Sequence, residues 1–272
     1  MSLHRLAVPS SLLAASLLLA APASLARADA ASDDTAAGAP AGARTAANED
    51  GFTPALTHAT GPVQAAVSAT ATIDRASKIS PVDLNGEIRI WGPARLVLRV
   101  DNIFGDGPNG KARPGIGAAV QMLDERRHGV AGSAYVSYKA EGFTEGEGEI
   151  EGLVSFGKQL GPVHGTLNLA YGQDPEAVER DGEIALGLHV EPLRGLFTGV
   201  VGRFRDALGS NGDKGTGILR DGLGAATATY VIGRIGVTAT AGIVGVKVLN
   251  TATQTTSTQT GAQAAFSVGT VF

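Results

Sequence analysis

The stretch VHGTLNLAY, residues 163–171, decides the fold class because its apolar and polar side chains alternate with a period of two. The large apolar residues all occupy odd-numbered positions, whereas His164, Thr166 and Asn168 occupy even-numbered ones. A helix would scatter these polar residues around its circumference, but a strand places them all on one face. The stretch therefore predicts a β-strand with one apolar and one polar face.

Neighbouring stretches repeat this alternation. Between residues 147 and 156, the glutamates Glu147, Glu149 and Glu151 face one side and large apolar residues face the other, and residues 183–190 behave alike. Counting every stretch that passes this test gives twelve strands, with ten as the alternative because the stretches nearest the N-terminus alternate less clearly. No apolar run reaches the roughly 20 residues of a membrane-spanning helix, and 38 glycines disfavour helices in general.

The predicted connections between strands alternate between short and long. Short connections are expected near residues 92–93, 124–128, 157–162, 191–194 and 233–234. Long connections are expected at residues 74–85, 102–112, 141–146, 173–180, 206–220 and 250–261. This alternation is typical of an all-β, antiparallel up-and-down transmembrane barrel, in which hairpins are short at one end and long at the other. A secreted β-sandwich is the alternative fold, because only 5% of residues are aromatic and the expected aromatic girdles are thin.

The N-terminus has the pattern of a secretory signal peptide. Arg5 precedes an apolar run from Leu6 to Ala21, and small residues at Ala26 and Ala28 suit a signal peptidase. We expect a signal peptide over residues 1–28, cleaved after Ala28. Residues 29–61 have almost no large apolar side chains, so we interpret them as a flexible periplasmic leader that precedes the barrel domain, residues 62–272.

The composition excludes several classes of function. A formal net charge of −4 leaves no broad basic surface for a nucleic acid. The absence of cysteine excludes disulfides, thiolate metal sites and cysteine nucleophiles. No phosphate-binding glycine loop and no metal-ligand spacing is recognisable, so the sequence predicts no cofactor and no metal.

The C-terminal strand carries a recognisable pattern. Phe266, Val268 and Thr270 alternate before the terminal Phe272. This resembles the last strand of Gram-negative outer-membrane β-barrel proteins. The resemblance implies that these four residues are an assembly signal read by the barrel-assembly machinery, and that the barrel lies in outer-membrane lipid. Short turns would then face the periplasm and long loops the outside, and by analogy with small barrels we expect a monomer.

If the apolar face of each strand contacts lipid, the polar face must line the interior. The residues predicted to line the pore are Arg95, Arg99, Gln121, Lys139, Glu147, Glu149, Glu151, His164, Asn168, Glu183, His189, Arg203 and Arg205. The row of three glutamates could attract cations, or it could be neutralised by Lys139, Arg203 and Arg205. An interior that carries charges of both signs could let small solutes pass, or ion pairs between strands could close it.

Three functions remain open. The first is porin-like passive transport of small polar solutes, and the second is a plugged structural or surface-interaction barrel acting through its loops. The third is an outer-membrane enzyme, for which His164, Asn168 and His189 are the candidates at the rim of the barrel. No serine accompanies them in a comparable position, so we expect no catalytic site and no enzymatic activity.

Overall fold

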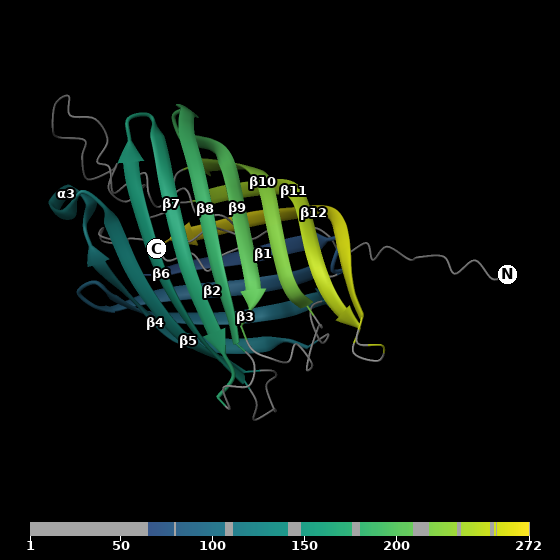
Figure 1. Cartoon of the computed structure of the whole chain (residues 1–272). Coiled ribbons are helices and arrows are strands. Elements are labelled where there is room, and N and C mark those ends of the chain that lie inside the picture. Colours follow the sequence, from purple (N-terminus) through teal and green to yellow (C-terminus); the bar gives the residue numbers. More distant parts are fainter. Residues whose placement is uncertain are drawn as a thin grey trace.

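Twelve antiparallel strands form one closed barrel (Figure 1). The computed structural model describes residues 65–78, 80–106, 111–140, 148–175, 180–208, 218–232, 235–250, 253 and 255–271. Each strand pairs with its neighbours in sequence, and β1 (Ala65–Asp74) pairs with β12 (Thr255–Val271) to close the sheet. The predicted signal peptide and leader, Glu147 and Phe272 lie outside the described residues.

The remaining elements run in sequence order around the barrel. They are β2 (Ser80–Trp91), β3 (Ala94–Asp106), β4 (Arg113–Leu123), the short helix α3 (Glu125–His128), β5 (Ala131–Ala140), β6 (Gly148–Leu160), β7 (Val163–Gln173), β8 (Arg180–Leu193), β9 (Leu196–Ala207), β10 (Ile218–Ile232) and β11 (Ile235–Asn250). The prediction of an up-and-down barrel with twelve strands is confirmed, and the alternative of ten strands is wrong.

Several strands are longer than the sequence predicted. Residues 81–85 and 255–261 were expected in long connections but belong to β2 and β12. Residues 157–160 and 191–193 were expected in turns but continue β6 and β8. These residues pair through their backbones even where their side chains do not alternate, as in the pairing of Thr255 with Asn250 at the tip of the β11–β12 hairpin.

The short turns gather at one end of the barrel. Figure 1 shows α3 and the β6–β7 turn together at the upper left. Gly161 and Gly195 provide the positive φ angles of the β6–β7 and β8–β9 turns, at 61° and 77°. A side chain in this left-handed region would be strained, which explains the glycine at both turns. We call this the short-turn end and the opposite one the long-loop end.

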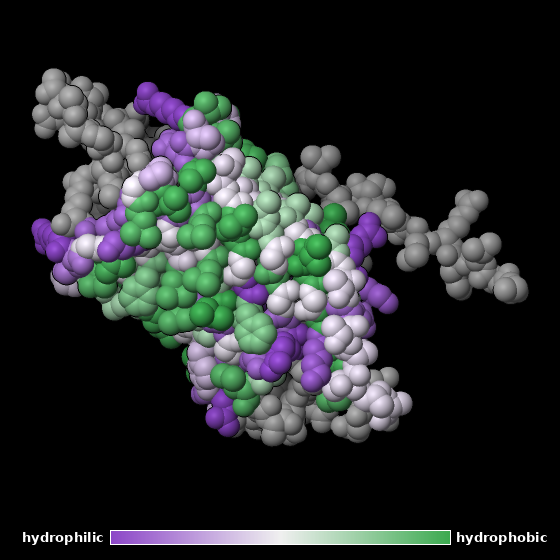
Figure 2. All heavy atoms as spheres, turned by 45° about the horizontal axis from the view of Figure 1, so that its top comes forward, coloured by the Kyte–Doolittle hydropathy of each residue, from purple (hydrophilic) through white to green (hydrophobic). Residues whose placement is uncertain are grey.

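The outer wall of the barrel is apolar. On β8, Leu186 is 55% exposed on the outside, whereas the adjacent Ala185 is 1% exposed inside. Large apolar side chains gather on the visible outer face in Figure 2, with hydrophilic residues toward its ends. Trp91, 82% exposed, lies at the short-turn end of β2. An apolar wall of this extent suits contact with lipid rather than with water.

No helix among the described residues is long and apolar enough to span a bilayer.

Apolar side chains also occupy parts of the interior. One cluster of Val97, Ala119, Tyr135 and Leu153 comes from β3 to β6. A second cluster comes from β9 to β11 and includes Ala76 of the β1–β2 connection. Its other members are Val201, Leu223, Ala225, Val244 and Val246. These two clusters narrow the space left for solvent and bring the polar interior residues close to one another.

Candidate functional site

A belt of charged side chains lines the interior near the long-loop end of the barrel. They come from inward-facing positions on β3 to β10, with β7 contributing none. The members of this charged belt are Arg99, Asp101, Arg113, Lys139, Glu149, Glu151, Asp181, Glu183, Arg203, Arg205 and Asp221. Five are basic and six are acidic, so the belt is close to neutral.

Arg99 and Lys139 connect the first half of the charged belt. Arg99 donates to both oxygens of Asp101, at 2.9 Å from Nε and 2.7 Å from Nη2. Its Nη1 also lies 2.6 Å from Glu151 Oε2. Lys139 Nζ lies 2.5 Å from Glu151 Oε1 and 2.9 Å from Glu149 Oε2. These charge-assisted hydrogen bonds link β3, β5 and β6 through their side chains.

Two glycines make room for these long side chains. Gly115 on β4 pairs with both Arg99 and Lys139, and a Cβ built on it would lie 2.8 Å from Arg99 Cγ. On β7, a Cβ at Gly172 would collide with the Glu149 carboxylate and lie 2.6 Å from Asp181 Oδ1. The long side chains of the belt therefore pass over β4 and β7 at these two glycines, where no side chain blocks them. This close approach explains a glycine in the middle of each strand.

Asp221 connects the second half of the charged belt. Its Oδ1 lies 2.6 Å from Arg203 Nη2 and its Oδ2 lies 2.9 Å from Arg205 Nε. Arg203 also approaches Glu183 at 3.8 Å, and Arg205 approaches Asp181 at the same distance. The Asp221 side chain is only 4% exposed. An isolated carboxylate would be costly at this depth, so the two guanidinium groups are what make its burial possible.

The glutamate row is neutralised differently from the prediction. Lys139 does pair with Glu149 and Glu151, as expected. Arg203 and Arg205 do not pair with the two described glutamates of this row, Glu149 and Glu151, because they lie on β9 and pair with acidic groups of β8 and β10 instead. Arg99, which the sequence did not assign to the row, takes their place.

Part of the interior wall, on β10 and β11, carries hydroxyl groups. Inward-facing threonines pair across these two strands, with Thr229 Oγ1 2.8 Å from Thr238 Oγ1 and Thr240 Oγ1 3.2 Å from Thr227 Oγ1. These hydroxyls satisfy one another at depth. The interior therefore has paired hydroxyls on β10 and β11 in addition to the charged belt on β3 to β10.

A third polar group lies at the short-turn end. The buried pair of Arg95 and Glu87 joins β3 to β2 with 2.6 Å between Nη1 and Oε2. His164 on β7 pairs in register with His189 on β8, and each is only 3% exposed. These four residues are distant along their strands from the charged belt.

The described residues among those predicted to line the pore occupy inward-facing positions. Of these, Arg99, Lys139, Glu149, Glu151, Glu183, Arg203 and Arg205 lie in the charged belt. Arg95, Gln121, His164 and His189 lie toward the short-turn end, and Asn168 is half-buried between them and the charged belt. The sequence analysis missed Asp101, Arg113, Asp181 and Asp221. Asp101 could have been found, because it shares the parity of Arg95 and Arg99 on one strand.

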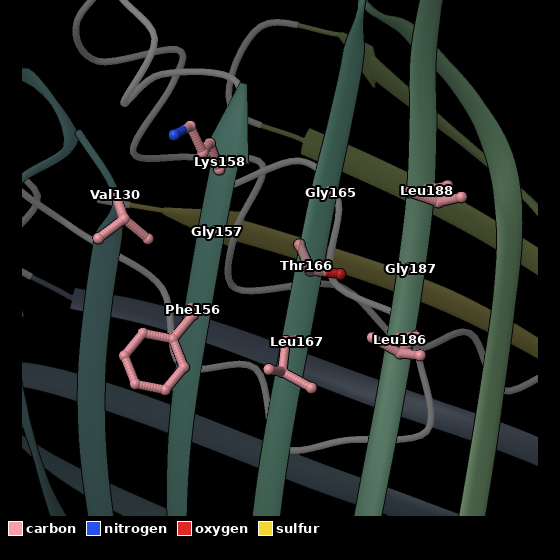
Figure 3. Close-up of a pocket in the computed structure, with 10 residues that line it drawn as sticks. All are labelled: Val130, Phe156, Gly157, Lys158, Gly165, Thr166, Leu167, Leu186, Gly187 and Leu188. Atoms are coloured by element: carbon pink, nitrogen blue, oxygen red, sulfur yellow. The ribbon is translucent and has the colours of Figure 1, made fainter. Parts of the chain in front are cut away.

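A concavity in the outer wall is a separate feature. It has a volume of about 310 Å³ and lies between β5 and β8. Figure 3 shows Phe156, Leu167 and Leu186 side by side on neighbouring strands, with Lys158 toward the short-turn end. Its apolar side chains suit an acyl chain of the bilayer better than a polar solute. The interior therefore remains the candidate functional site.

Within the described part of the chain, no group of three or more His, Asp or Glu side chains is arranged to hold a metal ion.

No protein-family model matches the sequence, and no curated protein matches it.

Three solved structures are among those that resemble this chain. A structure of the NanC porin is 7% identical, with a TM-score of 0.48, and the match covers 76% of this chain and 99% of that one. OmpT, an outer membrane protein of Vibrio cholerae, is 10% identical with a TM-score of 0.35, covering 76% and 98%. OccK11 (OpdR) of Pseudomonas aeruginosa is 9% identical with a TM-score of 0.35, covering 76% and 67%. These values describe a likeness in barrel shape and carry nothing about substrate.

The physical features of the chain itself are more informative than these likenesses. The sheet is closed and antiparallel, its outer wall is largely apolar, and the charged belt lies inside. Only a closed barrel satisfies every backbone group of a strand within lipid. The chain therefore has the architecture of a closed, up-and-down β-barrel whose outer wall suits contact with lipid.

Proposed function

We propose that this chain is a porin-like barrel of the outer membrane that lets small polar solutes pass passively through its interior. The observation that carries the proposal is the charged belt, which brings both signs of charge into the interior near the long-loop mouth. Belt side chains such as Arg205, 37% exposed, retain contact with solvent. Charges that line a route in this way replace part of the hydration of a polar solute as it enters.

The balance of positive and negative charges in the belt bears on the class of solute. Because the belt contains both acidic and basic groups in nearly equal number, no single-sign field covers the mouth. A highly charged anion or cation would meet repulsion from part of the belt at every position. We therefore propose neutral or zwitterionic solutes of small size. A passive route needs no catalytic group, so the proposal includes no enzymatic activity.

A second candidate is a barrel with a closed interior that acts through its outer surface or loops. Val244 and Val246, which face inward on β11, are 0% and 1% exposed. Tyr135 on β5 and Leu153 on β6 also face inward and are buried. Packing of this kind favours a narrow or plugged interior, in which the ion pairs of the belt would mainly stabilise the fold.

Solute entry into proteoliposomes separates the two candidates. Because the chain has no cysteine, Asp181→Cys introduces a single thiol into the belt, and Asp206→Cys places one on the outward side of β9 as the control. Liposomes containing the refolded chain should swell in isoosmotic glycine or arabinose. A bulky thiol reagent should slow swelling for Asp181→Cys and leave Asp206→Cys unchanged. A folded barrel that swells no faster than empty liposomes would overturn the proposal in favour of the closed barrel.

A further inference from the structure

The two inward-facing histidines lie at one level of the barrel wall. The register pairs Gln159 on β6 with His164 on β7, and His164 with His189 on β8. Side chains that are directly opposite on antiparallel strands have Cβ atoms about 4.5–5.5 Å apart. All three occupy inward-facing positions, so the interior wall carries an imidazole, an imidazole and a carboxamide side by side.

Four polar atoms of this group lack a hydrogen-bond partner among the described residues. Both ring nitrogens of His164, Nδ1 of His189 and Oε1 of Gln159 are buried, and none of them has a partner in the structure. The Gln159 amide is held in place, because its Nε2 donates to the Gly161 carbonyl at 2.5 Å. Buried polar atoms in proteins are almost always satisfied. The inward-facing threonines pair with each other, whereas these four atoms have no such partner within the described part of the chain.

The wall is shaped around the His189 ring. Gly199 lies opposite His189 on β9, and a Cβ built on it would be 2.6 Å from His189 Cδ2. A Cβ built on Gly187 would be 2.9 Å from His189 Cε1. Both glycines therefore keep space that the imidazole uses. The ring is confined to the wall without a hydrogen bond that would explain its position.

A nearby carboxylate adds negative charge at the same rim. Glu125 of α3 accepts a hydrogen bond from the Gln159 backbone nitrogen at 2.7 Å through Oε1, and its Oε2 is buried without a partner. The charge lies on the β5 side of Gln159, away from the two histidines. The Glu125 carboxylate does not form a three-residue metal-binding group with His164 and His189. Its negative charge nevertheless makes this rim more favourable for a cation.

We propose that His164 and His189 bind a first-row divalent transition-metal cation, such as Cu²⁺, Ni²⁺ or Zn²⁺, in the interior at the short-turn end. Neutral imidazole nitrogen is a preferred ligand of these ions, whereas Ca²⁺ and Mg²⁺ prefer oxygen ligands. Gln159, whose Oε1 has no partner and whose position is in register with His164, is the proposed third ligand, with water completing the coordination. The site is open, with only two imidazole ligands. Both histidines were expected at the rim of the barrel as candidate catalytic residues, and the β7–β8 register places them directly opposite each other although 25 positions separate them in the chain.

Copper binding to the refolded full-length mature chain tests this proposal, with no histidine tag present. Electron paramagnetic resonance of the chain with one equivalent of Cu²⁺ should show hyperfine coupling to two nitrogens. Isothermal titration with Zn²⁺ should give one site per barrel, weakened at least about tenfold by either His164→Ala or His189→Ala, because removing a direct ligand exceeds the usual effect of an outer one. The matched controls are His128→Ala, at an exposed position on α3, and His58→Ala, and neither should alter the affinity.

The wild-type spectrum keeps the test decisive even if a variant fails to fold. Coupling to fewer than two nitrogens would overturn the proposal, as would His128→Ala or His58→Ala abolishing binding. Heat-modified migration of each variant in electrophoresis shows whether the barrel has formed. The proposal does not depend on transport, since binding is measured without a solute. A barrel that binds copper through these histidines but passes no solute would retain the site and lose the proposed function.

Discussion

Replacing Asp221 with Asn should destabilise the barrel strongly. The carboxylate is 4% exposed and bonds to Arg203 at 2.6 Å and to Arg205 at 2.9 Å. The amide keeps the shape but removes the charge, so both guanidinium groups lose their main partner. Breaking a buried ion pair costs about 3–5 kcal/mol. Arg205 is partly hydrated and Arg203 still has Glu183 at 3.8 Å, so we expect the lower end of that range, about 3 kcal/mol.

Unfolding by urea in lipid vesicles measures this loss. Trp91, the only tryptophan, provides the fluorescence signal. A loss of about 3 kcal/mol with a slope of about 1–3 kcal/mol per molar urea lowers the midpoint by about 1–3 M. The control is Asp206→Asn, whose pair with Arg220 is at the surface, and its midpoint should match the wild type. Equal midpoints for Asp221→Asn and the control would refute the reasoning that buried pairing holds β9 and β10 together.

Three further predictions concern the inner and outer walls. Glu87→Leu or Arg95→Met alone should each lower the urea midpoint, because each leaves one member of a buried ion pair in place. The double variant should recover most of this loss of stability. A double variant no more stable than the single ones would contradict the prediction. Brominated lipids should quench the fluorescence of Trp91, which is exposed on the outer wall, and unquenched emission would remove this residue from the bilayer interface. Leu186→Arg, in the middle of β8, should cost about 2–4 kcal/mol in vesicles, and a refolded variant as stable as wild type would mean that this wall does not contact lipid.

The fold was predictable because lipid and an enclosed interior impose opposite demands on neighbouring residues. On β8, Ile184, Leu186 and Leu188 face outward and Ala185 and His189 face inward. In the sequence, this contrast appears as an alternation of large apolar residues with small or polar residues at a period of two. The number of strands and their up-and-down order follow from counting such stretches.

The strand ends were not predictable in the same way. Residues 255–260 of β12 are all exposed, and Thr, Ser and Gln occupy both faces. Alternation therefore disappears although the backbone continues to pair with β11. For the same reason, Asp221 was not predicted to face the interior. It follows a long connection, and the alternation is clear only from Leu223 onward. Partners such as Arg203 and Asp221 could not be identified either, because the register between strands does not follow from the pattern of either strand.

The single-channel conductance of the refolded mature chain in a planar bilayer tests the central proposal most directly. Glu149→Gln is the informative variant, because this carboxylate lies in the charged belt 2.9 Å from Lys139 Nζ. We expect stepwise currents for the wild type and a shift of selectivity toward anions when the carboxylate is removed. A folded, heat-modifiable barrel that remains silent, or currents whose selectivity is the same in both proteins, would contradict it.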